Sequence, residues 1–308
     1  MLKALLSRLL QSLLVLFVLF TVTFFLVKAL PGSPLTREKA MPEHIRVKME
    51  KYYGLDKPVP VQYAIQLGRF VQGDPGYSFR LEGRAVGDII RQAFPVSFQL
   101  GVLAMAVAVT IGIPAGCLAA ARKNGLIDVL SMSIAMFGIC LPSFVIGPLL
   151  AEYFGRQLQI LPAFGWDAVD PKTWILPAIT LGLAYGAYLS RLTRAGMLET
   201  LSQDFVRTAK AKGVPGWKIL IRHCLRGGLI PAVAYIGPAF AGIVSGSLVI
   251  ETVFQVPGLG RHFIKSIETT DVPVIMGVTM LYGSLVIAAN FLTDLAGIWL
   301  NPRLRKSS

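Results

Sequence analysis

Long runs of apolar residues, separated by shorter polar stretches, dominate the pattern of the chain. A membrane-spanning helix needs about 20 apolar residues, because the hydrocarbon core is roughly 30 Å thick and a helix rises about 1.5 Å per residue. Six runs are long enough to cross: Leu9–Val27, Ala93–Ala121, Val129–Ala151, Trp174–Ser190, Gly227–Ile250 and Val272–Leu300. The first run exceeds the core of about 7 to 15 residues typical of a cleaved signal peptide. The pattern predicts an all-α membrane protein with six transmembrane helices.

Composition agrees with this class of protein. Of the 308 residues, 54% are hydrophobic and 15% are charged, whereas a soluble domain has about 25% charged residues. The three cysteines show no zinc-binding spacing, and His44, His223 and His262 fall in three different loops. No metal site is therefore expected.

Basic residues predict the orientation of the crossings. If the N-terminus is cytoplasmic, the inside segments carry fifteen Lys and Arg residues, and the two short outside loops carry four. This bias favours two cytoplasmic termini. The net charge of +13 then follows from topology and from contact with membrane lipid, and no nucleic acid is needed to explain it.

The expected organisation follows from the six crossings and the loops between them. It comprises an N-terminal helix (residues 1–30), an external loop region (31–92), a five-helix core (93–300) with a cytoplasmic loop (191–226), and a tail (301–308).

The stretch "FVRTAKAKGVPGWKILIRHCL", residues 205–225, cannot cross the membrane. It carries five Lys and Arg residues, and each would cost about 2.5 to 3.5 kcal/mol at the centre of a bilayer. Leu198, Leu201, Phe205 and Ala209 recur at helical spacing and predict an amphipathic helix. Residues 213–216, "GVPG", predict a sharp corner, after which a second helix begins at Trp217. This pattern suits either a segment lying on anionic lipid or a docking surface for a cytosolic partner.

The same stretch resembles the cytoplasmic loop signature of ABC importer permeases, which reads Glu-Ala-Ala, three residues, Gly, nine residues, Ile-x-Leu-Pro. Ala209, Gly213 and Leu225 match it, whereas the segments "RT" at 207–208 and "HCLR" at 223–226 depart from it. The variant looks like that of the peptide and nickel branch. Further likeness runs along nearly the whole chain, in "LPGSP", "GDPGYSF", "FPVSFQLG", "LPSFVIGPLL", "VIETVFQVPGLG" and "NPRLR". The chain most resembles the first, B-type, permease subunit of oligopeptide importers.

This resemblance implies a type I importer permease with a long external loop after its first helix and a coupling helix between its fourth and fifth. The implied partners are a second homologous permease, two cytosolic ATP-binding subunits and an external peptide-binding protein. ATP and Mg would be bound by the ATPase subunits, since this chain has no Gly-Lys dipeptide and hence no phosphate-binding loop. The implied location is the bacterial cytoplasmic membrane. The implied cargo is an oligopeptide, with a dipeptide, nickel or glutathione as alternatives.

The resemblance also implies which residues couple to the ATPases. The small residues would allow close approach of a partner, and the basic ones would pair with its acids. The coupling residues are Phe205, Arg207, Thr208, Ala209, Lys210, Ala211, Lys212 and Gly213.

Two further groups are candidates for the translocation path or its outer rim. The fifth crossing carries small residues at helix-packing spacing and ends in an acid, which we expect to be satisfied near the outer interface; these residues are Gly237, Gly242, Ser245, Gly246 and Glu251. Plain helix packing is the favoured interpretation. In the external loops, the turn residues Gly73, Asp74, Gly76, Ser78, Pro257 and Gly258 are placed to face the binding protein or to cap the path.

Other function classes are less well supported. A secondary transporter would show inverted repeats or ionisable groups at mid-membrane, and a membrane enzyme would show a nucleophile or metal cluster. We find neither pattern in the sequence.

Overall fold

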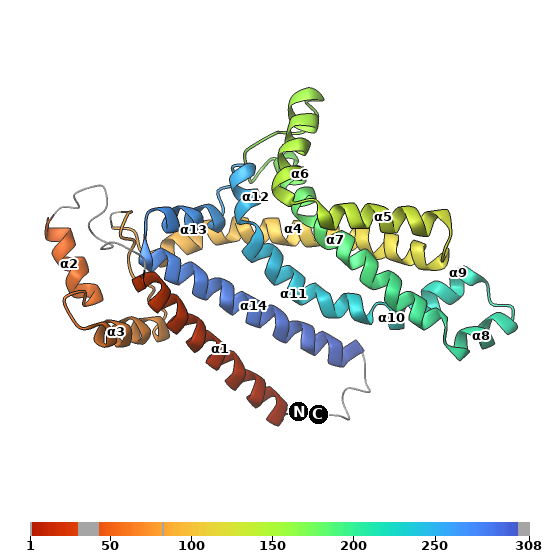
Figure 1. The fold of residues 1–308 in the computed structure, drawn as a ribbon, viewed down its shortest axis with the longest axis horizontal. Helices are drawn as coiled ribbons and strands as arrows, with labels where there is room; N and C mark the ends of the chain where they lie inside the picture. Colours follow the sequence, from red (N-terminus) through yellow and green to blue (C-terminus); the bar gives the residue numbers. More distant parts are fainter. Residues whose placement is uncertain (1, 30–42, 82, 301–308) are drawn as a thin grey trace. The chain divides into compact units, whose positions relative to one another are not determined.

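A computed structural model describes residues 2–29, 43–81 and 83–300, with side chains at 7–29, 47–81 and 83–293. The motifs "LPGSP" and "NPRLR" and the tail at 301–308 lie outside the described residues. The helices (Figure 1) are α1 Leu2–Ala29, α2 Glu43–Tyr53, α3 Val59–Val71, α4 Val86–Ala121, α5 Leu126–Cys140, α6 Ser143–Leu150, the π-helix η1 Ala151–Gln157, α7 Lys172–Leu201, α8 Asp204–Ala211, α9 Gly216–Lys218, the π-helix η2 Ile219–Cys224, α10 Leu225–Gly228, α11 Ile230–Gly246, α12 Leu248–Val253, α13 Leu259–Glu268 and α14 Val272–Leu300. No strand occurs in these ranges, and one isolated bridge joins Tyr77 to Ala85.

Five stretches are continuous, long and apolar enough to cross a membrane: Ser7–Ala29, Val86–Ala121, Lys172–Leu201, Ile230–Val253 and Val272–Thr293. They correspond to five of the six expected crossings. The expected fourth crossing is too short, because α7 continues past Ser190 to Leu201.

The third expected crossing, Val129–Ala151, is not one continuous helix. Its two halves, α5 and the α6–η1 pair, are bent by 102°. The break falls at Leu141 and Pro142, where Leu141 is extended with φ −81° and ψ 121°. Proline lacks an N–H and disfavours the helical conformation of the preceding residue. The pair forms a sixth span only if it is counted as one broken span.

Residues 1–96 and 257–285 form one compact unit. The external region expected as a loop contains α2 and α3, and α4 already begins at Val86. The buried core of this unit brings together aromatic and apolar residues of α1, α2, the "GDPGYSF" loop and α14, among them Phe20, Phe24, Tyr53, Phe79 and Met276. The external segment is thus anchored by its own hydrophobic core.

A buried carboxylate ties the "GDPGYSF" loop to the start of α14. Asp271 is 3% exposed, and it accepts hydrogen bonds from the Ser78 hydroxyl and from the Phe79 N–H at 3.0 Å. Ser78 Oγ in turn accepts from the N–H groups of Arg80, at 3.1 Å, and Leu81, at 2.8 Å. Burial raises the pKa of Asp271, and the hydrogen bonds from Ser78 and Phe79 oppose that rise.

Ser78→Ala is expected to destabilise this unit by about 2 to 3 kcal/mol, because it removes a donor to a buried carboxylate and an acceptor for two N–H groups. The measurement is the thermal unfolding midpoint in detergent. Ser284→Ala is the matched control, since that hydroxyl is exposed and bonds only within its own helix, to Met280 O. Equal midpoints for the two variants would contradict the role assigned to Ser78.

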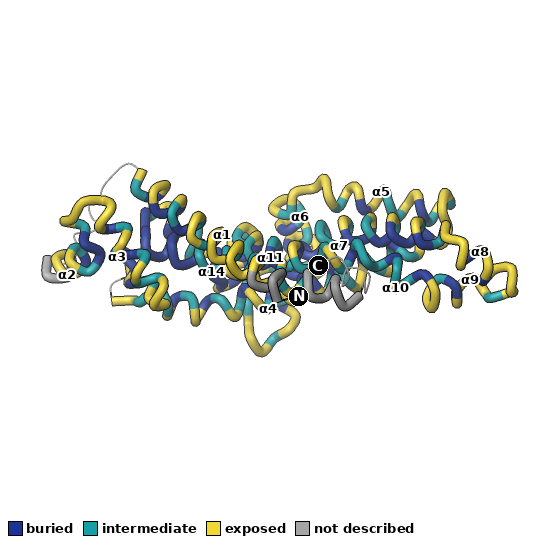
Figure 2. Tube along the Cα trace, turned by 90° about the horizontal axis from the view of Figure 1, so that it is seen from below, coloured by how far each residue is buried: buried dark blue, intermediate teal, exposed yellow. Residues whose placement is uncertain are grey.

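The described residues of the second compact unit are 97–256 and 286–300. In Figure 2 the trace of α7 is mostly buried or intermediate, whereas α8 and α9 are mostly exposed. Helices α4 and α7 approach so closely that added side chains would meet backbone. A Cβ at Gly112 would lie 2.5 Å from Gly186 O, one at Gly116 would lie 2.4 Å from Ser190 O, and one at Gly182 would lie 2.5 Å from Ala104 O. Such small-residue contacts let membrane helices pack backbone to backbone.

Candidate functional site

We call residues 202–226 the connecting segment; it joins α7 to α11 at one end of the second unit (Figure 1). The single amphipathic helix expected from Leu198 to Ala209 is not present as such. Helix α7 ends at Leu201, and α8 begins at Asp204 after a turn in which Gln203 N donates to Thr200 O at 3.2 Å. Gln203 itself is extended, with φ −75° and ψ 154°. The break resets the helical register.

As a result, the buried face of α8 differs from the expected one. Val206 is 1% exposed and Ala209 is 9% exposed, whereas Phe205 is 43% exposed. Val206 and Ala209 belong to a buried cluster that also contains Ala120 of α4, Met197 of α7, and Ile219 and Cys224 of η2. Ala209 therefore packs against its own chain. Its side chain is expected from the sequence to face a partner, and the structure buries it instead.

This cluster joins α8 to both long helices of the unit. It also buries Cys224, and burial raises the pKa of its thiol while the charge of Lys210 opposes the rise. We call these buried residues (Ala120, Met197, Val206, Ala209, Ile219 and Cys224) the base of α8. Because close-packed interiors are nearly incompressible, a force on α8 is passed to α4 and α7.

The opposite face of α8 is open. Arg207, Thr208, Ala211, Lys212 and Gly213 are all exposed. Arg207 Nη1 lies 3.6 Å from Asp204 Oδ1, and its side chain is 80% exposed. Exposed pairs of this kind contribute little, so the guanidinium is available to another protein.

The expected corner follows α8. Gly213 has φ +73°, its N–H donates to Lys210 O at 2.9 Å, and Val214 N donates to Ala209 O at 3.1 Å. Glycine adopts this left-handed conformation at little cost. The return path from Gly216 is helical, as expected, but most of it is the π-helix η2.

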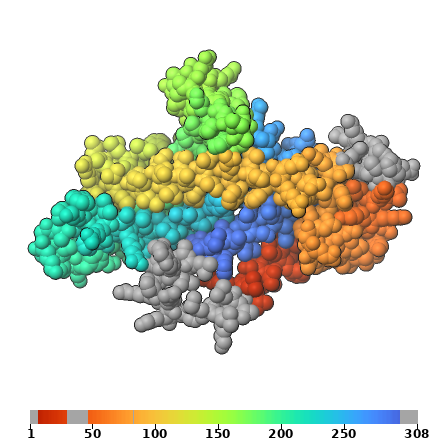
Figure 3. Space-filling model, turned by 180° about the vertical axis from the view of Figure 1, so that it is seen from behind, coloured from red at the N-terminus to blue at the C-terminus, as the bar shows by residue number. Residues whose placement is uncertain are grey.

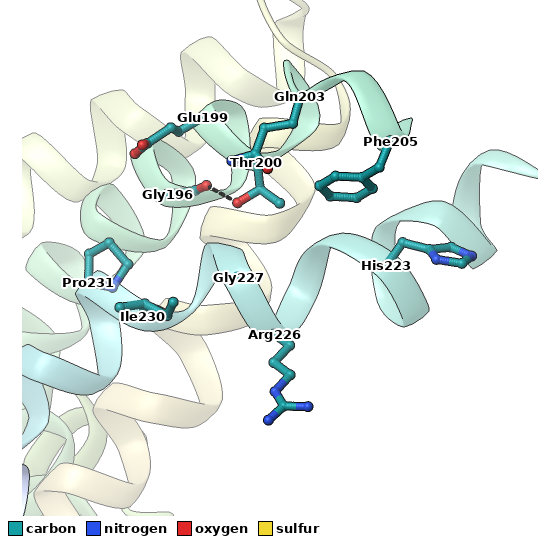
Figure 4. Close-up of a pocket in the computed structure, with 10 residues that line it drawn as sticks. All are labelled: Gly196, Glu199, Thr200, Gln203, Phe205, His223, Arg226, Gly227, Ile230 and Pro231. Carbon is teal, nitrogen blue, oxygen red and sulfur yellow. Dashed lines mark hydrogen bonds between the residues drawn. The ribbon is translucent and has the colours of Figure 1, made fainter. Parts of the chain in front are cut away.

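A recess of about 610 Å³ opens beside this segment, lined by residues of α7, α8, η2, α10 and α11. Figure 4 shows the Phe205 ring turned toward Thr200, whose hydroxyl donates to Gly196 O at 2.9 Å. The side chains of His223 and Arg226 point away from Thr200. The polar groups do not converge on one point, and the described residues include no group of three potential metal ligands.

An ion pair that sequence reasoning missed fixes the start of α5 to α7. Arg194 Nε lies 2.5 Å from Asp128 Oδ1, and Arg194 Nη2 lies 2.7 Å from Oδ2. Asn124 N also donates to Oδ2 at 2.9 Å. The Asp128 side chain is 4% exposed and that of Arg194 is 27% exposed. The only signal in the sequence was an acid in the first turn of α5, and its partner is 66 residues away.

The candidates of the fifth crossing make contacts within the chain. Gly237 is pressed against α14, where an added Cβ would lie 2.7 Å from Ala289 O. Gly242 and Gly246 both face the hydroxyl of Tyr185 on α7. A Cβ added at Gly242 would lie 3.1 Å from that oxygen, and one added at Gly246 would lie 3.9 Å from it. The hydroxyl of Ser245 donates to Ala241 O at 2.8 Å.

Glu251 of α12 is fully buried, with no exposed surface, and accepts a hydrogen bond from the Ser247 hydroxyl at 2.6 Å. Its backbone O accepts from Val256 N at 2.8 Å. Glu251 therefore stabilises the junction between α11 and α12.

The external candidates form turns. Gly73 and Gly76 have φ +76° and +86°. Asp74 accepts from Gly76 N at 2.9 Å and from the Tyr52 hydroxyl at 2.6 Å. Burial, together with the hydrogen bond to Asp74, raises the pKa of Tyr52 to about 12. Farther along the chain, Gly258, which follows Pro257, is the N-cap of α13.

The apolar helices long enough to cross a membrane, and the exposed short helix on a buried base, define a helical membrane protein with a polar connecting segment. Residues 112–306 match the binding-protein-dependent transport system inner membrane component, and residues 1–101 match the N-terminal part of the membrane component of such systems. The chain belongs to this family, and the resemblance to ABC importer permeases is confirmed.

Its relatives include permeases of peptide transport systems. The chain is 42% identical over 305 residues to the oligopeptide transport system permease protein OppB of Haemophilus influenzae, covering 99% of this chain and all of that one. It is 41% identical over 288 residues to the dipeptide transport system permease protein DppB of Bacillus subtilis, covering 94% and 93%.

Solved structures show the same fold. An inward-facing structure of the MetNI methionine ABC transporter matches with a TM-score of 0.56 at 13% identity, covering 69% of this chain and 96% of that chain. An amino acid ABC transporter matches with a TM-score of 0.54 at 16% identity, covering 68% and 94%. The chain is thus a multi-pass inner-membrane subunit. Its family implies a partner permease, ATPases and a substrate-binding protein.

Proposed function

We propose that the chain is one of two permease subunits of an ATP-driven peptide importer and forms half of the translocation path. The observation that carries this proposal is α8, an exposed short helix on a buried base continuous with α4 and α7. The names of the relatives, oligopeptide and dipeptide permeases, support a peptide cargo, and the whole-chain motif likeness described above favours oligopeptides.

In this proposal the two cytosolic ATPases bind ATP and Mg, and one of them docks on the open face of α8. Closure of the ATPases displaces α8 as a rigid element, and its base carries the displacement to α4 and α7. The chain itself binds no cofactor and catalyses no reaction. Both termini are cytoplasmic, and the exposed turn residues Gly73, Asp74 and Pro257 face the external peptide-binding protein. The buried residues Gly76, Ser78 and Gly258 support these turns from within the chain.

The residues of the open face have different roles in docking the ATPase. Arg207 and Lys212 supply positive charge for acids of the ATPase, and Thr208, Ala211 and Gly213 allow its surface to approach closely. Phe205 and Lys210 lie on the two flanks, since Phe205 lines the 610 Å³ recess and Lys210 lines a different groove. Ala209 does not contact the ATPase and contributes by packing in the base of α8.

The experiment that tests this function is purification of the tagged chain, expressed from its own locus, in a mild detergent, followed by mass spectrometry of the accompanying proteins. We expect a second permease and one or two ATPases. Uptake of labelled peptides of increasing length, with the external binding protein present, then separates oligopeptide from dipeptide transport. A chain that purifies alone and transports without ATP would disprove the proposal.

Arg207→Glu is expected to lower peptide uptake at least about tenfold, because one reversed charge at a docking surface costs on the order of 1.4 kcal/mol or more. Co-purification of the ATPases should fall in parallel. Arg222→Glu is the matched control, since Arg222 is also exposed but lies on η2. Unchanged uptake and ATPase association in Arg207→Glu would contradict the coupling role of this face.

A further inference from the structure

A groove of about 720 Å³ lies between the end of α4 and the connecting segment. In Figure 3 these two parts of the chain, yellow and teal, lie next to each other. Three basic side chains line the groove, Arg122 and Lys123 after α4 and Lys210 on the flank of α8. Its remaining lining is apolar or uncharged and includes Leu198 and Trp217, and no acid is part of it.

The lining of this groove carries three basic side chains and no acid. Asp128 is the acid that follows Arg122 and Lys123 in the sequence, and Arg194 and the N–H of Asn124 already hold its carboxylate. In the part of the chain that the structure describes, no ion pair uses Arg122, Lys123 or Lys210. The groove is therefore suited to an anion.

Large apolar side chains are exposed at Trp217, which lines the groove, and farther along the return path. Trp217 is 63% exposed, and Ile221 on the same return path is 58% exposed. Lys218 Nζ lies 5.5 Å from the centre of the Trp217 ring. Tryptophan beside lysine is typical of the membrane–water interface, where an amphipathic ring and a basic side chain are both satisfied.

The position along α4 agrees with an interfacial site. The apolar helix α4 extends over 36 residues and ends at Ala121, so Arg122 and Lys123 directly follow a membrane span. With the orientation proposed above, this end is cytoplasmic, on the side where anionic lipids attract basic side chains.

We propose that this groove binds the phosphate-bearing headgroup of an anionic phospholipid from the cytoplasmic leaflet, with Trp217 and Ile221 resting in the interfacial layer. The proposal rests on the orientation given under the proposed function. The exposed indole and isoleucine favour a lipid over an acidic protein surface. The lipid headgroup would then lie against Lys210 and support one flank of α8, while the open face stays free for the ATPase.

The test measures quenching of Trp217 fluorescence by phospholipids with brominated acyl chains. The chain is purified in detergent with the subunits that accompany it and mixed with brominated phosphatidylglycerol or brominated phosphatidylcholine. Trp217→Phe identifies the contribution of Trp217, because the chain has four tryptophans. Neither ATP nor peptide is needed, so the result does not depend on whether the importer function is correct.

We expect brominated phosphatidylglycerol to quench Trp217 at a lower concentration than brominated phosphatidylcholine. Arg122→Gln/Lys123→Gln should reduce this preference by roughly fivefold for each charge removed. Lys48→Gln/Lys51→Gln on α2 is the matched control, with the same loss of charge from exposed positions, and should keep the preference.

Three results would overturn the proposal. Equal quenching by the two lipids would show that the headgroup is not recognised. Displacement of brominated phosphatidylglycerol by an excess of inorganic phosphate would show a site for a soluble anion. Unchanged quenching in Arg122→Gln/Lys123→Gln, together with lost ATPase association, would show that the groove binds the ATPase.

Discussion

Gly116→Leu will prevent α4 and α7 from packing, and the chain will not accumulate as a folded membrane protein. A Cβ at Gly116 would lie 2.4 Å from Ser190 O, 2.6 Å from Thr193 Cβ and 3.0 Å from Arg194 N. Two of these atoms belong to the backbone of α7 and cannot move aside as a flexible side chain would. Overpacking typically costs about 1 to 3 kcal/mol, and a leucine that meets backbone should exceed this range.

The consequence extends beyond one contact. One turn away on the same face, Gly112 meets Gly186 O, so separating the helices at Gly116 also opens that contact. The base of α8 draws Ala120 from α4 and Met197 from α7. A displaced α4 therefore loosens the base on which coupling depends.

A graded pair of variants isolates the steric cause. Gly116→Ala should destabilise the protein by about 2 kcal/mol or more, because of overpacking and despite the higher helix propensity of alanine. Gly87→Ala on the same helix, where nothing lies within 4 Å of the added Cβ, should stabilise it by up to about 1 kcal/mol. The measurements are the yield of monodisperse protein in detergent and the thermal unfolding midpoint. A shift of the same sign in both alanine variants would refute the close-approach argument.

Asp128→Ala is expected to destabilise the second unit by about 2 to 3 kcal/mol and to reduce peptide uptake strongly. Removing one partner of a buried ion pair typically costs about 3 to 5 kcal/mol, because the other charge remains in a poorly solvated site. Arg194 is 27% exposed, which places the expected value toward or below the lower end of that range. Asn124 N would lose its acceptor as well.

The effect on uptake follows from position. The pair joins the start of α5 to α7 three residues before Met197, which belongs to the base of α8. Without the ion pair, a displacement of α8 still moves α7, but α5 is no longer held to α7 and does not move with it. In the assembled importer, ATP hydrolysis by the partner ATPases in the presence of peptide should therefore fall more than their hydrolysis in its absence.

A double-mutant cycle separates this role from simple loss of charge. Asp128→Ala/Arg194→Met removes both charges and should be more stable than Asp128→Ala alone. Asp128→Asn, which keeps the shape and one acceptor, should be intermediate. The measurement is the unfolding midpoint of each variant in the same detergent. A double variant no more stable than the single one would show that the pair is not coupled.

Much of this protein was determined by the sequence, because membrane insertion is decided segment by segment. Apolar runs predicted six crossings, five of which are continuous apolar helices in the described part of the chain. The charges of the connecting segment excluded it from the membrane. The "GVPG" corner was predictable as well, since Gly213 adopts a positive φ for reasons that concern only that residue. The family was readable from short motifs in a fixed order.

Only the tertiary structure decided which residues meet. Pro142 was visible in the sequence, but membrane helices tolerate proline when neighbours satisfy the freed backbone groups, and here the chain bends by 102° instead. The break before α8 buried Val206 in place of Phe205. Asp128 pairs with Arg194, which is 66 residues away, and Gly116 packs against the backbone of α7. These pairings depend on the close fit of surfaces far apart in the chain, which hydropathy and spacing do not encode.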